Sequence, residues 1–563
     1  MAVEGKAARA GESGKSMGLS ELLLKDTNTS LQKLGLMAVI AGGASAGILA
    51  CVNAAAQAPG GQHALWVALF GIALVAYVFS QKYVLVVTTD EVERIVDERR
   101  RSLIRKLAAC QLQGVEKIGH GAIFTAINSD AQTISQTAGS LMLGVQALIL
   151  MVWTALYLAT LSLPTLALVI VVMLIASVIY RKKIARARIE LRRAHGEVTA
   201  LHELVESLLG GFKEVKLSSR RAAELMDDAI AVSLRTAQFQ SLAQRALADT
   251  FIFSQVAIFV LLGTLVFVLP VLSSTVAATS VKSLAAVLFL VGPVSGIISS
   301  VPKITVANAA AENLMKLEQL LDEHVEAGHG EPARAGSRHD GSPGDGAFRT
   351  IQLRHLYFRR GEGRESFSVG PVDLSIERGQ TLFITGGNGS GKTTFIKMLT
   401  GLYPADSGAI VVDGRPVDKA GMQGYRDLFG AVFSDFHLFG KLYGIDSFAP
   451  ELGTGMIDEM EIENKVTLGA DGFSTIDLST GQRKRLALVS VQLEKRPIIL
   501  LDEWAADQDP HFRAKFYEQL LPRLKADGVT VIAITHDDKY FHHADRRLHM
   551  DEGRLTEIFR ETV

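Results

Sequence analysis

Six long apolar segments lie within the first 302 residues and constrain the fold more than any other feature of the chain. We place them at residues 34–56, 62–85, 137–158, 160–180, 250–271 and 279–300. A helix that crosses a bilayer needs about 20 apolar residues. The segments are almost free of Asp, Glu, Lys and Arg, each of which costs about 2.5–3.5 kcal/mol at the centre of a span. Helices buried in a soluble core are usually shorter and carry a polar face. The sequence therefore predicts an α-helical membrane domain with six spans.

The distribution of Lys and Arg predicts the orientation of these spans. Basic residues gather in segment 1–33 and in the connections 86–136 and 181–249, whereas the other three connections are short and nearly uncharged. Loops rich in Lys and Arg stay on the cytoplasmic side of a membrane. We therefore expect a multi-pass protein with both termini in the cytoplasm. The first span is too long, and lies too far from the start, to be a secretory signal.

The two basic connections are expected to be helical extensions of the spans. They carry apolar residues at helical spacing and contain no proline. Gly210-Gly211 is the best candidate for a turn between two such helices. We therefore assign residues 34–322 to the membrane domain and its cytoplasmic extensions. Residues 323–347, rich in Gly, Pro and charge, are predicted to be a flexible linker, and 348–563 a separate domain.

The overall charge and the cysteine content exclude several classes of protein. The chain has 58 basic and 59 acidic residues, so its net charge gives no reason to expect a nucleic-acid partner. Cys51 and Cys110 are the two cysteines, which excludes a disulfide framework and a metal site built from cysteines.

The second domain contains a predicted phosphate-binding loop. The apolar run 381–385 predicts a strand, and the sequence G-G-N-G-S-G-K-T-T at 386–394 leads into an expected helix. Glycines let the backbone amides close around phosphates, and the start of the helix adds a favourable dipole. Lys392 is expected to reach the β- and γ-phosphates, and Thr393 to bind Mg²⁺. The predicted phosphate-binding residues are Gly386, Asn388, Gly389, Ser390, Gly391, Lys392, Thr393 and Thr394.

Two adjacent carboxylates end a second buried strand. The apolar run 498–501 leads directly into Asp502 and Glu503. An unpaired buried charge is costly, so a partner is required. We expect Asp502 to hold Mg²⁺ opposite Thr393, and Glu503 to polarise the water that attacks the γ-phosphate. His536, at the end of a third apolar run, is expected to contact the same phosphate.

The sequence L-S-T-G-Q at 478–482 lies between the phosphate-binding loop and these carboxylates. It resembles the signature of ATP-binding-cassette proteins. Six spans followed by one cassette resemble an exporter-type half-transporter. The resemblance implies that ATP lies between the phosphate loop of one copy and the signature of a second copy. The signature residues are then Ser479, Thr480, Gly481 and Gln482, with Asp509 contacting the facing cassette.

Some positions depart from the general cassette pattern. The aromatic residue that stacks on adenine in the family has no clear counterpart, and Phe358 and Arg360 are the candidates, with Tyr357 as a substitute. Ser434 stands where a glutamine is usual, and Ser434 or Asp435 would meet Mg²⁺ or water in its place. The family resemblance also implies that the turns near 111–121 and 205–216 dock onto the cassette.

Three further stretches resemble a subgroup that exports cyclic, lasso or siderophore peptides from bacteria. They are G-F-K-E-V-K-L at 211–217, D-E-W-A-A-D-Q-D-P-H-F at 502–512 and T-H-D-D-K-Y-F at 535–541. The sequence thus predicts a six-span exporter-type membrane domain fused to an α/β P-loop nucleotide-binding domain. The predicted function is ATP-driven peptide efflux across the bacterial inner membrane by alternating access of a homodimer. A lipid flippase and an ATP-gated channel or sensor remain as alternatives.

Overall fold

The computed structural model describes residues 31–56, 63–268, 274–325, 348–361, 366–445, 448–469 and 472–558. It divides into two compact units. The helical unit comprises Met1–Leu103 and Gly121–Glu318, and the α/β unit comprises Ile104–His120 and Gln319–Val563. Most of the predicted linker 323–347 and of the N-terminal segment 1–33 lies outside the described residues.

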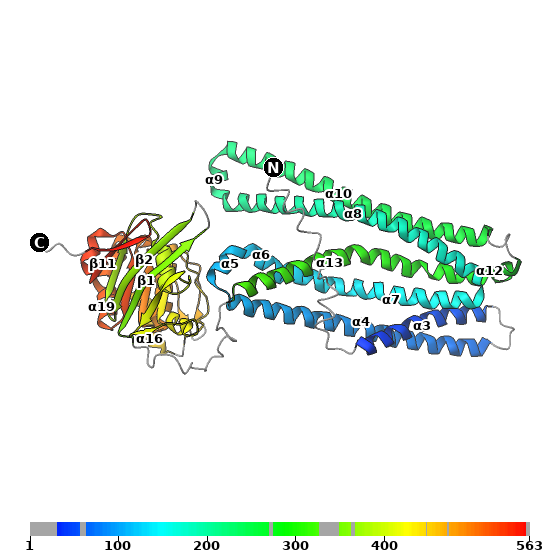
Figure 1. Cartoon of the computed structure of the whole chain (residues 1–563), viewed down its shortest axis with the longest axis horizontal. Helices are drawn as coiled ribbons and strands as arrows, with labels where there is room; N and C mark the ends of the chain where they lie inside the picture. Colours follow the sequence, from blue (N-terminus) through cyan, green and yellow to red (C-terminus); the bar gives the residue numbers. More distant parts are fainter. Residues whose placement is uncertain are drawn as a thin grey trace. The chain divides into compact units, whose positions relative to one another are not determined.

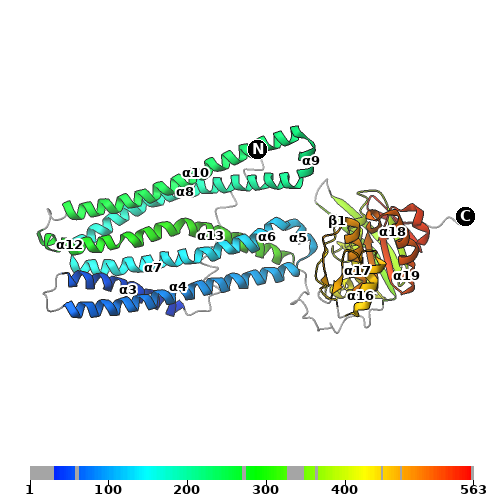
Figure 2. The same cartoon turned by 180° about the vertical axis from the view of Figure 1, so that it is seen from behind.

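The helical unit is a bundle of long helices that run side by side (Figures 1 and 2). Its helices are α3 (Leu31–Ala55), α4 (His63–Ala108), α6 (His120–Phe124), η1 (Thr125–Asp130), α7 (Ala131–Leu161), α8 (Leu163–Gly210), α9 (Phe212–Leu217), α10 (Ser219–Gly263), η2 (Thr264–Val268), α12 (Ser274–Phe289) and α13 (Val291–Glu323). The ends of α4 and α13 belong to the α/β unit.

Six of these helical segments are long and apolar enough to cross a membrane, as the sequence predicts. Their outward faces are also apolar. In α4, Ile72 and Phe79 are 67% and 73% exposed, and in α10 Phe259 is 66% exposed. Such exposure is unfavourable in water but is what hydrocarbon requires. The sixth segment is divided by a turn at Leu290, between α12 and α13, rather than continuous.

The expected helical extensions are present. Helix α8 runs without a break from its apolar half through the basic stretch to Gly210, where the Gly211 N–H bonds the Ser207 carbonyl at 2.9 Å. The predicted turn at Gly210-Gly211 is therefore confirmed. Short α9 follows, and α10 returns along α8 (Figure 1).

The α/β unit contains two larger sheets. A six-stranded sheet has the order β12-β11-β3-β10-β9-β6, in which all neighbours are parallel except β12 with β11. Its strands are β3 (Thr381–Thr385), β6 (Phe429–Val432), β9 (Ile498–Asp502), β10 (Thr530–Ile534), β11 (Arg546–Asp551) and β12 (Arg554–Ile558). A four-stranded sheet of order β2-β1-β4-β5 contains β1 (Thr350–Arg360), β2 (Phe367–Glu377), β4 (Ser407–Val412) and β5 (Arg415–Pro416). The short pair β7 (Leu468–Gly469) and β8 (Gly472–Phe473) completes the strands of the described residues.

Helices cover the six-stranded sheet. They are α14 (Lys392–Leu399), α15 (Met422–Arg426), α16 (Pro450–Glu459), α17 (Thr480–Leu493), η5 (Trp504–Asp507), α18 (Pro510–Lys515), η6 (Phe516–Leu520), α19 (Leu521–Ala526) and η7 (Asp538–His543). Every residue of β3, β9 and β10 is buried, which matches the continuous apolar runs expected of a parallel sheet covered on both faces. The three strands end in register, so the residues that follow them meet at one edge.

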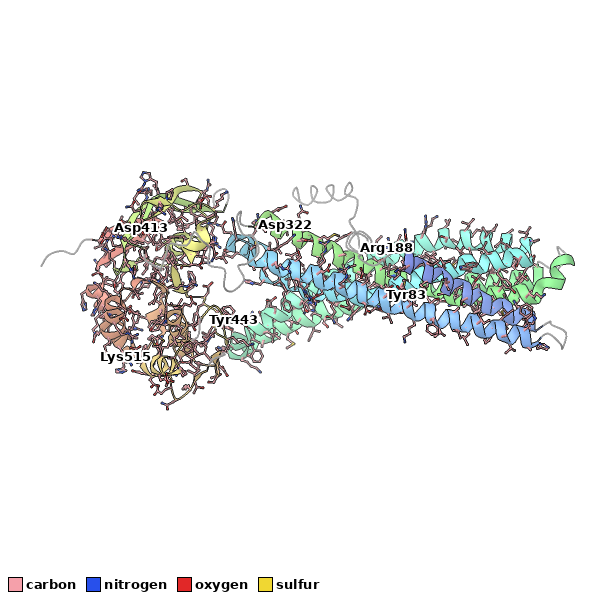
Figure 3. All side chains as sticks on the ribbon, turned by 90° about the horizontal axis from the view of Figure 1, so that it is seen from below. Tyr83, Arg188, Asp322, Asp413, Tyr443 and Lys515 are labelled. Atoms are coloured by element: carbon pink, nitrogen blue, oxygen red, sulfur yellow. The ribbon has the colours of Figure 1, made fainter. Side chains whose placement is uncertain are left out.

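Helix α5 (Leu112–Ile118) belongs to the α/β unit. Leu112 packs against the core that β1, β2 and α14 share. The Gln111 N–H bonds the His324 carbonyl at 3.0 Å, and Lys106 pairs with Asp322 at 2.7 Å. Figure 3 labels Asp322, near the end of α13. The packing of Leu112 and the contacts of Glu116 with Lys397 and Tyr403 confirm the expected docking of the turn near 111–121 onto the cassette. The turn near 205–216 lies in the helical unit, and its docking stays a prediction.

Candidate active site for nucleotide hydrolysis

The phosphate-binding loop occupies the predicted strand–loop–helix position, between β3 and α14. Gly386 has a φ of 142°, and a Cβ there would lie 2.2 Å from the Met550 carbonyl oxygen. Gly391, with a φ of 106°, lies against the ring of Phe367. Both positions therefore need glycine for conformation and for space.

Lys392 is buried at the start of α14 and points back into the loop. Its Nζ donates to the carbonyls of Gly386 and Gly387, each at 2.9 Å. The buried hydroxyl of Ser390 has no hydrogen-bond partner among the described residues. A curled loop with a buried ammonium and a spare hydroxyl donor is suited to an anion with many oxygens, such as a polyphosphate.

A cavity of about 480 Å³ lies over this loop. It is lined by Arg360, Phe367, Asn388, Gly389, Gly391, Lys392, Thr393, Thr394 and Glu503. Arg360 and Phe367 are direct partners in the β1–β2 ladder, so they form one end of the cavity together. Phe367 was not predicted, because no spacing in the sequence connects it to the loop before the two strands pair.

Asp502 ends β9 as predicted and is only 2% exposed. Burial raises the pKa of its carboxyl, and hydrogen bonds from Ser434 oppose that rise; the Ser434 N–H lies 3.4 Å from Oδ2. The hydrogen bonds from Ser434 offset only part of the cost of burying this carboxylate, so a cation beside Asp502 would be favourable. Oxygen donors from Asp502 and Thr393, completed by phosphate and water, fit Mg²⁺ rather than a softer metal.

Glu503 lies in the left-handed region of the backbone, with φ 49° and ψ 36°. Such a conformation costs on the order of 1–3 kcal/mol and is found mainly at functional sites. Its N–H bonds the Ile534 carbonyl, and its carbonyl accepts from the buried Lys484 at 2.8 Å. This turn directs the carboxylate into the cavity, where Oε1 lies 3.4 Å from Nε2 of His536. The predicted base and histidine are therefore neighbours.

The signature sequence forms the start of α17. Ser479 is the N-cap, and Gln482 reaches back to it as a capping box. A Cβ on Gly481 would lie 2.7 Å from the Asp507 carbonyl, so the close approach of the two segments needs glycine there. None of the four signature residues lines the cavity over the phosphate loop in the described part of the chain.

Asp509 joins the signature helix to the segment after Glu503. Its Oδ1 caps α18 by accepting from the Phe512 N–H at 3.0 Å, and its Oδ2 accepts from Arg485 at 2.6 Å. The backbone bond from Phe512 and the guanidinium of Arg485 lower the pKa of Asp509. Arg485 itself is buried over the Phe512 ring.

Known proteins are similar to this chain in sequence and in fold. Residues 369–506 match the family model described as ABC transporter. The ATP-binding protein SyrD of Pseudomonas syringae pv. syringae is 34% identical over 473 residues, which cover 82% of each chain. The chain belongs to the ABC transporter family. It is a multi-pass membrane ATPase that couples ATP hydrolysis to transport.

Two further comparisons concern the fold and the wider family. The transporter superposes on the structure of a bacterial Atm1-family ABC exporter with ATP bound, with a TM-score of 0.72 and 17% identity, over 96% of this chain and 95% of that one. This likeness shows the exporter fold. An ATP-dependent lipid A-core flippase of Albidiferax ferrireducens is 27% identical over 294 residues, or 50% of this chain and 48% of that protein.

Within the transporter, the two candidates for contact with adenine, Phe358 and Arg360, differ in whether their side chains reach the cavity. Phe358 is 2% exposed, and its ring packs on Tyr403 at 5.2 Å between centroids. Arg360 lines the cavity instead. Among the metal candidates, Ser434 hydrogen-bonds to Asp502, whereas Asp435 interacts electrostatically with Lys397 of α14.

Sequence reasoning also missed Lys484. Its Nζ holds the Glu503 carbonyl and pairs with Asp507 at 2.7 Å, while its own carbonyl accepts from the Trp504 indole at 2.7 Å. The basic run after the signature is a visible signal, but only the packing of α17 on η5 shows which of its cations turns inward.

Proposed function

We propose that two copies of this chain form an exporter that moves a small cyclic, lasso or siderophore-type peptide out of a bacterial cell. The exporter fold and the membership of the ABC transporter family support the export activity. The three stretches at 211–217, 502–512 and 535–541 support the cargo class. We place the transporter in the inner membrane with both termini in the cytoplasm, on the positive-inside distribution of its Lys and Arg.

The pairing of two copies is supported by the half-built active site. Among the residues that the structure describes, the cavity is lined by the phosphate loop and Glu503 and by no signature residue. A second copy related by a twofold axis supplies its signature to this cavity and receives the reciprocal one. The tip around α9 also carries exposed apolar side chains. Leu209 is 67% and Leu217 is 89% exposed, and the cassette of a second copy would cover them.

The residues have separate tasks in hydrolysis. Lys392 and the loop amides hold the β- and γ-phosphates. Asp502 and Thr393 would hold Mg²⁺, which would supply positive charge next to the transferring group. Glu503 accepts a proton from the attacking water, and His536 orients the γ-phosphate end of the site. Closure of two cassettes on ATP, followed by release after hydrolysis, drives alternating access in the membrane domain.

A lipid or lipid-linked cargo is the second candidate. It is supported by the partial likeness to the lipid A-core flippase and by the basic run Arg181, Lys182, Lys183 and Arg186 at the end of a span. Positive-inside topology accounts for the same charges, so we favour the peptide. Family membership and the paired Glu503 and His536 also favour coupled transport over an ATP-gated channel.

The test uses the full chain in lipid nanodiscs and in sealed vesicles. ATP hydrolysis is measured with a panel of cyclic and siderophore peptides, and uptake of labelled peptide is compared with flipping of labelled lipid. Stimulated hydrolysis and ATP-dependent uptake of a peptide support the proposal. Lipid movement that no peptide inhibits would replace it with the flippase. Flux that requires ATP but not its hydrolysis, and that runs only down the concentration gradient, would replace it with the channel.

A further inference from the structure

Glu116, on helix α5, is fixed by two strong contacts within the α/β unit. Its Oε1 lies 3.0 Å from Nζ of Lys397, and its Oε2 accepts from the Tyr403 hydroxyl at 2.7 Å. Lys397 lies on α14, the helix that begins with the phosphate-loop lysine, and Tyr403 is buried in the core beneath it. The carboxylate of Glu116 is thus held in place from two sides.

The charge state of this carboxylate follows from the same contacts. Burial acts to raise the pKa of Glu116, but hydrogen bonds from Tyr403 and Lys397 outweigh it and leave the pKa lowered. The carboxylate is therefore charged at neutral pH, and it presents a fixed negative charge next to the strand β1.

Arg360 is the third partner of Glu116. Its Nη2 lies 3.9 Å from Oε2 of Glu116, and its side chain is 61% exposed. The same side chain lines the cavity over the phosphate loop, beside its cross-strand neighbour Phe367. One guanidinium thus contacts Glu116 and forms the end of the cavity that also includes an aromatic ring.

A long exposed arginine has many rotamers, and binding a ligand requires that it adopt one of them. An anchored carboxylate reduces this cost, because it keeps the guanidinium near the cavity before the ligand arrives. A planar guanidinium and a ring stack well on a purine. Since the phosphate loop holds the other end of ATP, the Arg360–Phe367 pair is in position to meet the base.

We propose that Glu116 is a positioning residue for ATP, which holds Arg360 in place to contact the base of the nucleotide. The proposal rests on ATP binding in this cavity and not on the identity of the cargo. Because α5 follows α4 in the chain after three residues, any movement of α4 that withdraws Glu116 also releases Arg360. The affinity for ATP then depends on whether α5 is packed in the α/β unit with Glu116 in contact with Arg360.

The test compares Glu116→Gln, Arg360→Gln and the double variant in the full chain. We expect each single variant to raise the KM for ATP about 3- to 5-fold, as for an exposed ion pair, with a smaller change in kcat. The double variant should be no worse than Arg360→Gln. Glu224→Gln removes another exposed glutamate bound to an arginine, at 2.9 Å on α10, and should leave KM unchanged.

Inorganic tripolyphosphate separates positioning from general damage. It binds the phosphate loop but has no base, so its inhibition constant should be the same in the wild type and in Glu116→Gln. An equal shift for ATP and tripolyphosphate, or additive effects in the double variant, would overturn the proposal. If Glu116→Gln does not fold, Glu116→Asp and Arg360→Gln give the same comparison. If the wild type hydrolyses no ATP, the proposed function fails, and affinity for a fluorescent ATP analogue still tests Glu116.

Discussion

The helical unit exposes large apolar side chains, whereas the central strands of the α/β unit bury theirs. In α4 the side chains of Ile72 and Phe79 face outward, whereas in the α/β unit every residue of β3, β9 and β10 is buried, on both faces of the sheet. The first arrangement needs only an apolar surround, so many apolar residues would serve at each position. The second fixes where each strand ends, and the catalytic residues stand at those ends. Position therefore matters far more in the α/β unit.

The strongest test of this contrast is Glu503→Gln. The variant keeps the shape of the side chain but cannot accept a proton, so we expect hydrolysis to fall by at least about 100-fold while ATP still binds. Hydrolysis and binding of labelled ATP are measured in nanodiscs. Retention of more than a tenth of the activity would show that another group is the base.

A charge on each apolar surface tests the contrast directly. Ile72→Lys places an ammonium in the middle of a predicted span, at a cost of about 2.5–3.5 kcal/mol. Leu452→Lys changes a residue that is 42% exposed on α16 and should cost little. The fraction inserted in the membrane and the thermal unfolding temperature report the two effects. Equal losses would mean that the outward face of α4 does not contact lipid.

Gly481→Ala tests how closely the signature approaches the segment after Glu503. Its Cβ would meet the Asp507 carbonyl at 2.7 Å, so we expect a loss of about 1–3 kcal/mol in the stability of the α/β unit, with reduced hydrolysis. Gly424→Ala, on α15 with no atom near its Cβ, is the matched control and should be neutral or slightly stabilising. Thermal unfolding of both variants makes the comparison.

The smallest expected effect is on pH. The pKa of Glu116 is lowered in the folded chain, so its contribution to the docking of α5 is complete above the ordinary glutamate value of about 4.3 and is lost as pH falls through the lowered value. Hydrogen exchange in α5, corrected for intrinsic rates, should match between pH 8 and about pH 5.5. A loss of protection in this range that is absent from Glu116→Gln would contradict the assignment.

Sequence patterns predicted the spans and the chemistry for different reasons. The spans follow from apolar length alone, and the loop at 386–394, Asp502 and His536 follow from strands that must end at one edge of a sheet. Phe367, Lys484 and Glu116 could not be predicted in this way. Each acts through a partner whose position the sequence does not mark: Phe367 through Arg360, Lys484 through Glu503, and Glu116 through Lys397. The first pair forms only when β1 and β2 pair, and the other two form only when helices pack in the folded unit. Phe358 illustrates the reverse case, since a favourable residue type became part of the core.

Lys484 has a consequence for how two ATP molecules are used. It belongs to the signature helix, which in the proposed dimer faces the nucleotide held by the other copy, yet its ammonium holds the carbonyl of Glu503, which serves the nucleotide held by its own chain. A shift of α17 at one site therefore pulls on the strained turn that carries the base of the other. Through this single buried side chain, ATP hydrolysis at one site of the dimer would depend on the state of the other site.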